Sequence, residues 1–190
     1  PADSSDEFQL SVAVTTTDGS DSTTSTGTLD VNVAGDADAP SLNLFTAAGD
    51  EDAAIPLQIN AGLSDTDGSE TLSITISDVP AGATLNNGTL VSTDPETGVQ
   101  TWSLDQADLS GLTITPATDA SGEFNLSVAV TATEADGDTS TTSGTMTVGV
   151  DGVADFPTLD LSTPVSGTED TAIPLSIDAG LSDASETLSV

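Results

Sequence analysis

The sequence predicts an all-β protein made of β-sandwich units that follow one another head to tail. Three observations support this fold class. Apolar and polar residues alternate in short runs, as in strands that bury one face. Residues typical of turns, mainly Gly, Asp, Asn and Pro, separate these runs. Finally, whole segments return at a separation of about 117 residues, which is the length of a domain rather than of a solenoid turn.

The repeat sets the domain organisation. EFQLSVAV from Glu7 returns as EFNLSVAV from Glu123, 116 residues later, and EDAAIPL from Glu51 returns as EDTAIPL from Glu169, 118 residues later. Pro residues mark the junctions. We therefore expect the back part of one unit, a complete unit and the front part of a third, at residues 1–39, 40–156 and 157–190. The chain should then be a fragment of a longer array, and Pro1 opens in mid-pattern without a signal peptide.

The first half of the complete unit is expected to hold three strands. The earliest, 42–45, follows the junction. The second, 54–59, contains Pro56, which lacks a backbone N–H and therefore indicates an edge strand or a strand that switches sheets. The third, 70–77, places apolar residues at alternate positions, namely Leu72, Ile74 and Ile76.

The second half is expected to hold five more strands, at 89–92, 99–104, 111–115, 123–132 and 143–150. Asn86-Asn-Gly88 suggests a tight hairpin turn, and residues 105–109 could form one helical turn. Trp102 is interpreted as a core anchor rather than an exposed sugar-stacking residue. Seven or eight short strands in a unit of this length fit an immunoglobulin-like Greek-key β-sandwich.

Composition excludes several functions. The 190 residues include no Lys, Arg, His or Cys and 32 Asp plus Glu, for a net charge of −32. Nucleic-acid binding and attraction to an anionic membrane both need basic side chains. No apolar run approaches the roughly 20 residues of a membrane helix. Nucleophile–histidine pairs and Schiff-base lysines are impossible, and a glycosidase-type carboxylate pair lacks aromatic support, so we expect no enzyme activity.

Carboxylates without internal cations favour an external hard cation, above all Ca²⁺, which takes six to eight oxygen ligands. Acidic residues gather in four places: the junction, the segment before the second strand, the loop before the third strand, and the loop between the last two strands. Loops at one end of a sandwich cluster in space, so we expect the junction acids to meet those of the second and third groups. The alternative is that these loops are ordinary Asp-rich turns. The ligand candidates from these groups are Asp36, Asp38, Glu51, Asp52, Asp65, Asp67, Glu70, Asp136 and Asp138.

The ordered motifs GDEDAAIPLQINAGLSDTDGSETLSITISDVPAGATL, GLTITP, SGEFNLSVAVTATEADGD and GVADFPTLDL resemble the cadherin-like tandem repeats of giant RTX-type bacterial adhesins. The resemblance covers essentially the whole chain. It implies calcium-binding extender domains in contact with neighbouring repeats, type I secretion, and an extracellular place on the bacterial cell surface. It also implies a surface ligand bound by other domains, and a role of the parent protein in cell adhesion and biofilm formation.

The same resemblance makes Asp36, Asp38, Glu51, Asp65 and Asp67 the best ligand candidates. It further implies that Asp136 and Asp138 face the next junction, where Asp155 and Glu169 would complete the set. The linkers depart from the family pattern, because they lack the Asn-Asp pair of animal cadherins. In addition, Val153 stands in the second linker where Asp36 stands in the first.

Two other functions fit the composition. One unit could itself bind a glycan or a peptide, or the chain could assemble laterally into a cell-surface filament. The loop Asp65–Glu70 recurs as the shorter Asp183–Glu186, so a metal in this loop should bind the second copy more weakly.

Overall fold

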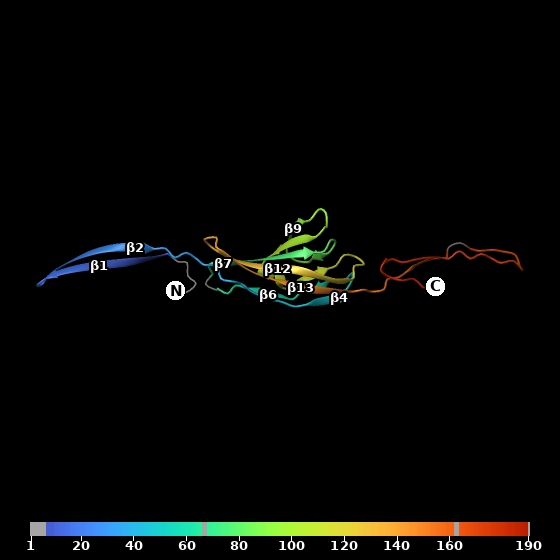
Figure 1. Cartoon of the computed structure of the whole chain (residues 1–190), viewed down its shortest axis with the longest axis horizontal. Helices are drawn as coiled ribbons and strands as arrows, with labels where there is room; N and C mark the ends of the chain where they lie inside the picture. The colour runs from blue at the N-terminus through green and yellow to red at the C-terminus, as the bar shows by residue number, and fades with distance from the viewer. Residues whose placement is uncertain (1–6, 66–67, 162–163, 190) are drawn as a thin grey trace.

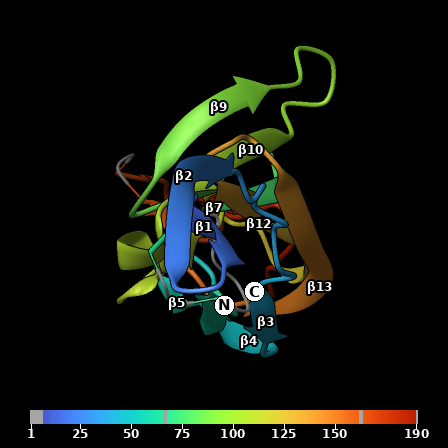
Figure 2. The same cartoon turned by 90° about the vertical axis from the view of Figure 1, so that its left-hand side faces the viewer.

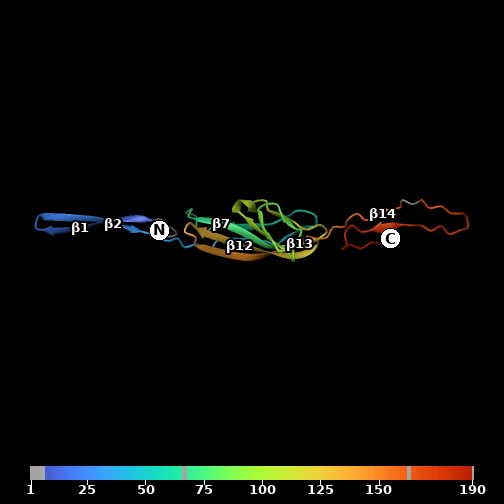
Figure 3. The ribbon, with the colours of Figure 1, turned by 90° about the horizontal axis from the view of Figure 1, so that it is seen from above.

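The computed structural model describes residues 7–65, 68–161 and 164–189, which form an elongated arrangement of β-strands (Figures 1 and 3). The hairpin of β1 (Phe8–Asp18) and β2 (Asp21–Val31) lies at one end. A β-sandwich occupies the middle, and the pair β14 (Thr158–Asp160) and β15 (Asp178–Gly180) lies at the other end. The prediction of an all-β fold is confirmed. Within the described residues, no helix is long and apolar enough to cross a bilayer.

One layer of the central sandwich is a six-stranded sheet. Its spatial order is β4 (Ala47–Asp50), β13 (Thr139–Asp151), β12 (Gly122–Glu134), β7 (Glu70–Val79), β10 (Gln100–Leu104) and β9 (Thr89–Thr93). β4 runs parallel to β13, and the other neighbours are antiparallel. β9 is one edge of this sheet and stands out from the rest of the sandwich (Figure 2).

The facing layer has two parts. One is the sheet of β5 (Ile55–Pro56), β11 (Thr113–Thr115) and β8 (Thr84–Leu85), and the other is the pair of β3 (Ser41–Leu44) and β6 (Ile59–Gly62). A short 3₁₀ helix, η1 (Gln106–Leu109), precedes β11. Because the chain alternates between the layers, neighbours such as β7 and β12 are distant in sequence, which gives the crossed connections of an immunoglobulin-like sandwich.

Alternating side chains fill the space between the layers. On β12, Leu126, Val128 and Val130 are at most 1% exposed, and the intervening residues face outward. Ile74 and Ile76 of β7 lie on the same core face with no exposed surface. Trp102 is half-buried against this core, and its Nε1–H donates to Gln100 Oε1 at 2.9 Å. The interpretation of Trp102 as a core residue is therefore confirmed.

Most expected strands are present, with two differences. The segment 54–59 is divided: Ile55 and Pro56 pair with β11, whereas β6 pairs with β3. Since β5 is also an edge strand of its sheet, both alternatives expected from Pro56, an edge strand and a switch of sheets, are present. The hairpin expected at Asn86-Asn-Gly88 is wrong, because β8 and β9 belong to different sheets. The Asn86 and Asn87 amides instead donate to the carbonyls of Gly111 and Asp108 at 3.0 and 2.9 Å.

Candidate metal centres at the two linkers

Residues 35–39, the first linker, pass over the end of the sandwich where β12 ends and β7 begins. Three backbone N–H groups of the linker donate to carboxylates of the sandwich. Gly35 N contacts Asp136 Oδ2 at 3.1 Å and Ala37 N contacts Asp138 Oδ2 at 3.4 Å. The third contact joins Asp38 N to Glu70 Oε1 at 2.8 Å. In a chain without basic side chains, these amides supply part of the positive charge that the acids require.

Two carboxylates lie side by side beneath this linker. Glu70 and Glu134 are directly opposite each other in the β7–β12 register, and they are 7% and 6% exposed. One oxygen of each, Oε2, is buried without a hydrogen-bond partner among the described residues. A Cβ added to Gly35 would lie 2.8 Å from Glu134 Cδ, so the linker backbone sits directly on this carboxylate. Like charges in this position repel, and each loses hydration.

Residues 152–156, the second linker, leave the opposite end of the sandwich. Glu51 is 5% exposed there, and its Oε1 accepts a hydrogen bond from Val153 N at 2.7 Å. Its Oε2 is the third buried carboxylate oxygen without a partner in the described part of the chain. Glu51 N donates to Asp151 O at 2.9 Å, which fixes the residue beside the exit of β13. A cavity of about 380 Å³ opens beside Glu51 and extends to Asp183 and Glu186.

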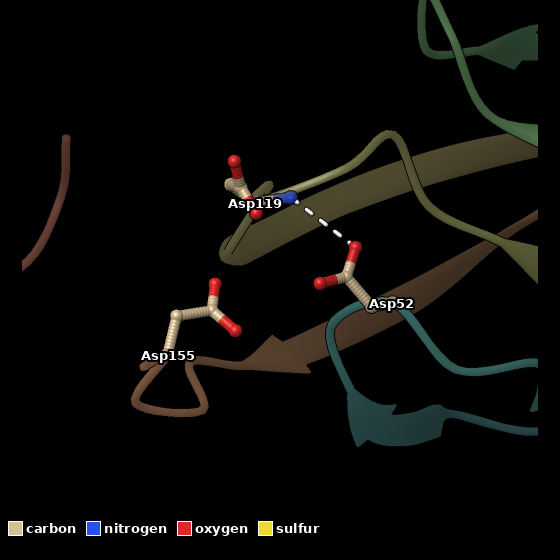
Figure 4. A group of neighbouring side chains, drawn as sticks. All are labelled: Asp52, Asp119 and Asp155. Carbon is tan, nitrogen blue, oxygen red and sulfur yellow. Dashed lines mark hydrogen bonds between the residues drawn. The ribbon is translucent and has the colours of Figure 1, made fainter. Parts of the chain in front are cut away.

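Three further carboxylates gather next to Glu51. Asp52, Asp119 and Asp155 come from three separate segments and face one space (Figure 4), with one oxygen of each within 4.8 Å of the others. Asp119 N also donates to Asp52 Oδ1 at 3.3 Å. Asp52 and Asp119 have φ of 56° and 57°, a left-handed conformation that Asp tolerates better than most residues.

The electrostatics of this group are unfavourable without a cation. Partial removal from water raises the pKa of Asp119 above its ordinary value, and the negative charges of Asp183, Asp52, Asp155 and Glu51 raise it further. Asp183 behaves in the opposite way, because the hydroxyl and N–H of Ser185 donate to it and lower its pKa. The carboxylates around Asp119 therefore repel one another, and their oxygens lie close enough together to bind one cation.

The two linkers are held in the same way. Asp155 N donates to Glu186 Oε1 at 2.6 Å, as Asp38 N does to Glu70 Oε1. The hydroxyl of Ser182 donates to Phe156 O at 2.7 Å, and that of Ser64 donates to Ala39 O at 2.6 Å. Each linker is therefore anchored to the segment that follows it by an equivalent amide–carboxylate contact and an equivalent hydroxyl–carbonyl contact.

The predicted ligand residues divide between these two places. Six of them lie at the first end, either in the linker or in and beside the loops there: Asp36, Asp38, Asp65, Glu70, Asp136 and Asp138. Glu51, Asp52 and Asp155 lie at the second end. Glu169 is exposed in the C-terminal segment and has no place in the group around Asp119. Asp67 lies outside the described residues.

Two of the expected groupings are wrong. Glu51 and Asp52 do not join Asp36 and Asp38, because β4 runs parallel to β13 and ends with it at the second linker. Asp136 and Asp138 do not face the second junction, because β12 runs back along the sandwich and delivers its loop to the first linker. Strand direction, which the acidic motifs do not reveal, decides both outcomes.

The ligand candidates from the sequence omit three relevant residues. Glu134 belongs to the acidic loop, but it also ends the inward-facing series of β12. Extending the alternation of Leu126, Val128 and Val130 to position 134 would have predicted that this side chain points inward. Asp119 is a single acid between two expected strands, and only its position at the same end as the second linker distinguishes it. Glu186 was identified as the counterpart of Glu70, and it accepts the equivalent linker hydrogen bond.

The donor set at both linkers consists of carboxylate and backbone oxygens. Soft metals that prefer sulfur or imidazole have no suitable ligand at the linkers, because the chain lacks Cys and His and its one Met, Met146, is buried in the core. Several acids on short loops, with buried oxygens that lack partners, fit a hard divalent cation of the Ca²⁺ type. The residues present are thus compatible with the predicted ion.

No protein-family model and no curated protein matches this chain. Among solved structures, it is similar to the protocadherin gammaB7 EC3-6 cis-dimer structure at 19% identity and a TM-score of 0.36, over 83% of this chain and 36% of the other. The protocadherin GammaB4 extracellular domain matches at 17% and 0.37, over 83% and 24%. Drosophila N-cadherin EC1-4 matches at 15% and 0.32, over 93% and 42%. The chain spans less than half of each, and with TM-scores below 0.5 these similarities carry no argument.

Proposed function

We propose that this chain is a non-catalytic extender segment of a large secreted bacterial surface adhesin of the RTX type, stiffened by Ca²⁺ at the junctions between successive cadherin-like repeats. In this proposal residues 1–39, 40–156 and 157–190 belong to three successive repeats. Their neighbours are other repeats of the same chain, and the parent protein supports adhesion or biofilm formation outside the cell. The adhesin part of the proposal rests on the ordered sequence motifs, and the calcium part rests on the linker geometry.

One observation carries the calcium proposal. Glu51, Glu70 and Glu134 are each at most 7% exposed, and each keeps one buried oxygen without a partner among the described residues. Burial of a charged carboxylate costs several kcal/mol unless an opposite charge compensates it. The sequence contains no Lys, Arg or His, so no side chain of the chain can supply the compensating charge, and a bound cation would supply it.

The ligands of the proposed ions follow from the two groups. At the first linker, Glu70, Glu134, Asp136 and Asp138 would contribute from the sandwich, and Asp36 and Asp38 from the linker. At the second linker, Glu51, Asp52, Asp119 and Asp155 would contribute. Since each group combines sandwich and linker residues, an ion would restrict the angle between the bodies that the linker joins, which is the mechanical role proposed here.

The test compares thermal unfolding of the full chain in Ca²⁺ and in excess chelator. We expect the midpoint to rise by about 10 °C or more in Ca²⁺, since a ligand at 1,000 times its dissociation constant stabilises the folded state by about 4 kcal/mol. Mg²⁺ at the same ionic strength is the control, because it accepts irregular carboxylate cages poorly. Equal midpoints in Ca²⁺ and chelator would refute the proposal.

A peptide-binding function is the second candidate, and β9 favours it. Leu90 and Val91 on this edge strand are 46% and 63% exposed, and an edge strand can accept an extended peptide. Binding of the full chain to a peptide array, abolished by Val91→Pro and retained in chelator, would support this function over the spacer role.

A further inference from the structure

The second linker carries an aromatic side chain that nothing covers. Phe156 is 94% exposed. Its counterpart in the first linker is Ala39, which is also exposed although a complete sandwich follows it. The backbone carbonyl of each residue accepts a hydrogen bond from an equivalent Ser hydroxyl, which belongs to Ser182 for Phe156 and to Ser64 for Ala39. The backbone of this linker position is therefore held in the same way at both joints, and at the second joint the side chain that it carries is an exposed aromatic ring.

An apolar cavity opens at the end of the sandwich that the second linker leaves. It has a volume of about 220 Å³. Among the described residues that line it, Glu123 is the one charged side chain. Its apolar lining includes Pro80, Ala81, Pro116, Ala117, Phe124 and Val150.

The linker starts at the rim of this cavity. A Cβ added to Gly152 would lie 3.7 Å from Ser121 Cβ, and Ser121 lines the cavity. Phe156 follows Gly152 by four residues, a span of at most about 14 Å when extended. In the extended joint, Val153 N and Asp155 N are bound to Glu51 and Glu186 on either side, and this arrangement leaves the ring in solvent.

We propose that the second joint has a closed state in which the Phe156 ring occupies this cavity. Closure gives up the contact of Asp155 N with Glu186 and removes a large aromatic surface from water, a favourable change for a residue of this size. The linker then acts as a hinge with two positions. An ion at Asp52, Asp119 and Asp155 would hold the extended position, and this last point rests on the proposed function.

Site-specific cross-linking of the full chain in chelator tests the closed state. A photoreactive benzoyl analogue of Phe replaces Phe156, so an aromatic ring is kept, and the same analogue replaces Ala39 as the matched control. We expect cross-links from position 156 to peptides containing 80–83 or 116–124 in the monomeric product, at least fivefold above those from position 39. Equal yields, other target peptides, or the same targets only in cross-linked dimers would overturn the proposal.

A distance measurement provides a second readout with the native ring. The chain has no Cys, so Ser143→Cys and Thr171→Cys can carry the only two spin labels, on exposed positions either side of the joint. We expect a short-distance population in chelator that Phe156→Ala removes; an unchanged distribution would refute closure. Because both experiments are decided without Ca²⁺, a failure of the calcium proposal would leave their outcome unaffected.

Discussion

At the scale of single residues, the buried acids have a positional explanation. Glu134 and Glu70 occupy inward-facing positions of β12 and β7, where an apolar side chain would normally continue the core. The strand pattern therefore carries two charges into the interior at the same end and in the same register row. Such a pair lowers stability on its own and becomes favourable only with a shared positive partner.

Glu134→Gln should have opposite effects with and without metal. In chelator we expect the free energy of unfolding to rise by about 1–3 kcal/mol, because one uncompensated buried charge is removed. In Ca²⁺ the gain should disappear and the affinity should fall on the order of tenfold or more. Denaturant unfolding and calcium titration measure the two effects.

Glu96→Gln is the matched control, since it makes the same chemical change at an exposed turn. Its free energy of unfolding should equal that of the unsubstituted chain both in chelator and in Ca²⁺. A stabilisation of Glu134→Gln that persists unchanged in Ca²⁺ would argue against metal binding at this carboxylate.

Asp94 offers a pH-dependent test away from the linkers. Its Oδ1 accepts hydrogen bonds from Thr97 N at 2.9 Å and Glu96 N at 2.8 Å, and these contacts lower its pKa from the ordinary value of 3.8. A lowered carboxyl pKa adds stability above the unfolded-state value, and that stability is lost as pH falls through the folded-state value. Asp94→Ala should thus lower the melting midpoint at pH 7, and this loss should shrink as the pH falls below 3.8; a loss that is the same at every pH would contradict this.

At the scale of elements, the N-terminal hairpin and the β12–β13 hairpin are two copies in different surroundings. Leu126 has no exposed surface, whereas Leu10, its equivalent 116 residues earlier, is 45% exposed. The same sequence pattern therefore forms a core in one place and an open apolar face in the other. Strand formation follows the pattern, and burial follows the neighbours.

This difference gives a prediction with an internal control. Leu126→Ala should destabilise the sandwich by about 2–5 kcal/mol, because it leaves a cavity between packed layers. Leu10→Ala should change stability by less than about 0.5 kcal/mol, as an exposed substitution does. Urea unfolding followed by Trp102 fluorescence reports on the sandwich; similar losses for both variants would mean that the hairpin face is covered in solution.

The sequence predicts most strands and most acidic groups, but it does not predict which strands pair or which linker each acidic group meets. The alternation around Ile74 and Val128 marks strands and their inner faces, because a period of two is a local property. β4 and β8 escaped prediction because their sequences, AAGD and TL, contain no alternating run of large apolar residues. The sequence placed Glu51 at the first linker and Asp136 at the second, and the structure reverses both positions. Pairing partners and strand direction decide this, and they depend on contacts distant in sequence.

At the scale of the whole molecule, the two joints differ in charge. Val153 stands in the second linker where the first has Asp36. Its N–H is bound to Glu51 and its side chain is 48% exposed, so a new carboxylate there would adjoin the second group without displacing core residues.

Val153→Asp should strengthen calcium binding at the second joint on the order of tenfold, because affinity depends on the number of charged ligands. Val153→Asn, which adds an oxygen without charge, should give a smaller gain. Calcium titration by calorimetry distinguishes the two variants. Equal calcium affinity for Val153→Asp and the unsubstituted chain would show that position 153 lies outside the ion's coordination.

The sandwich takes in the chain and releases it at opposite ends, since β3 follows the first linker and β13 leads into the second (Figure 1). β4 lies parallel to β13 in the register Val148–Ala47 to Asp151–Asp50. Tension applied along the rod would pull these two strands past each other, so their hydrogen bonds would carry the load together. A hairpin peeled from one end breaks its bonds singly. The arrangement therefore resists force by shear.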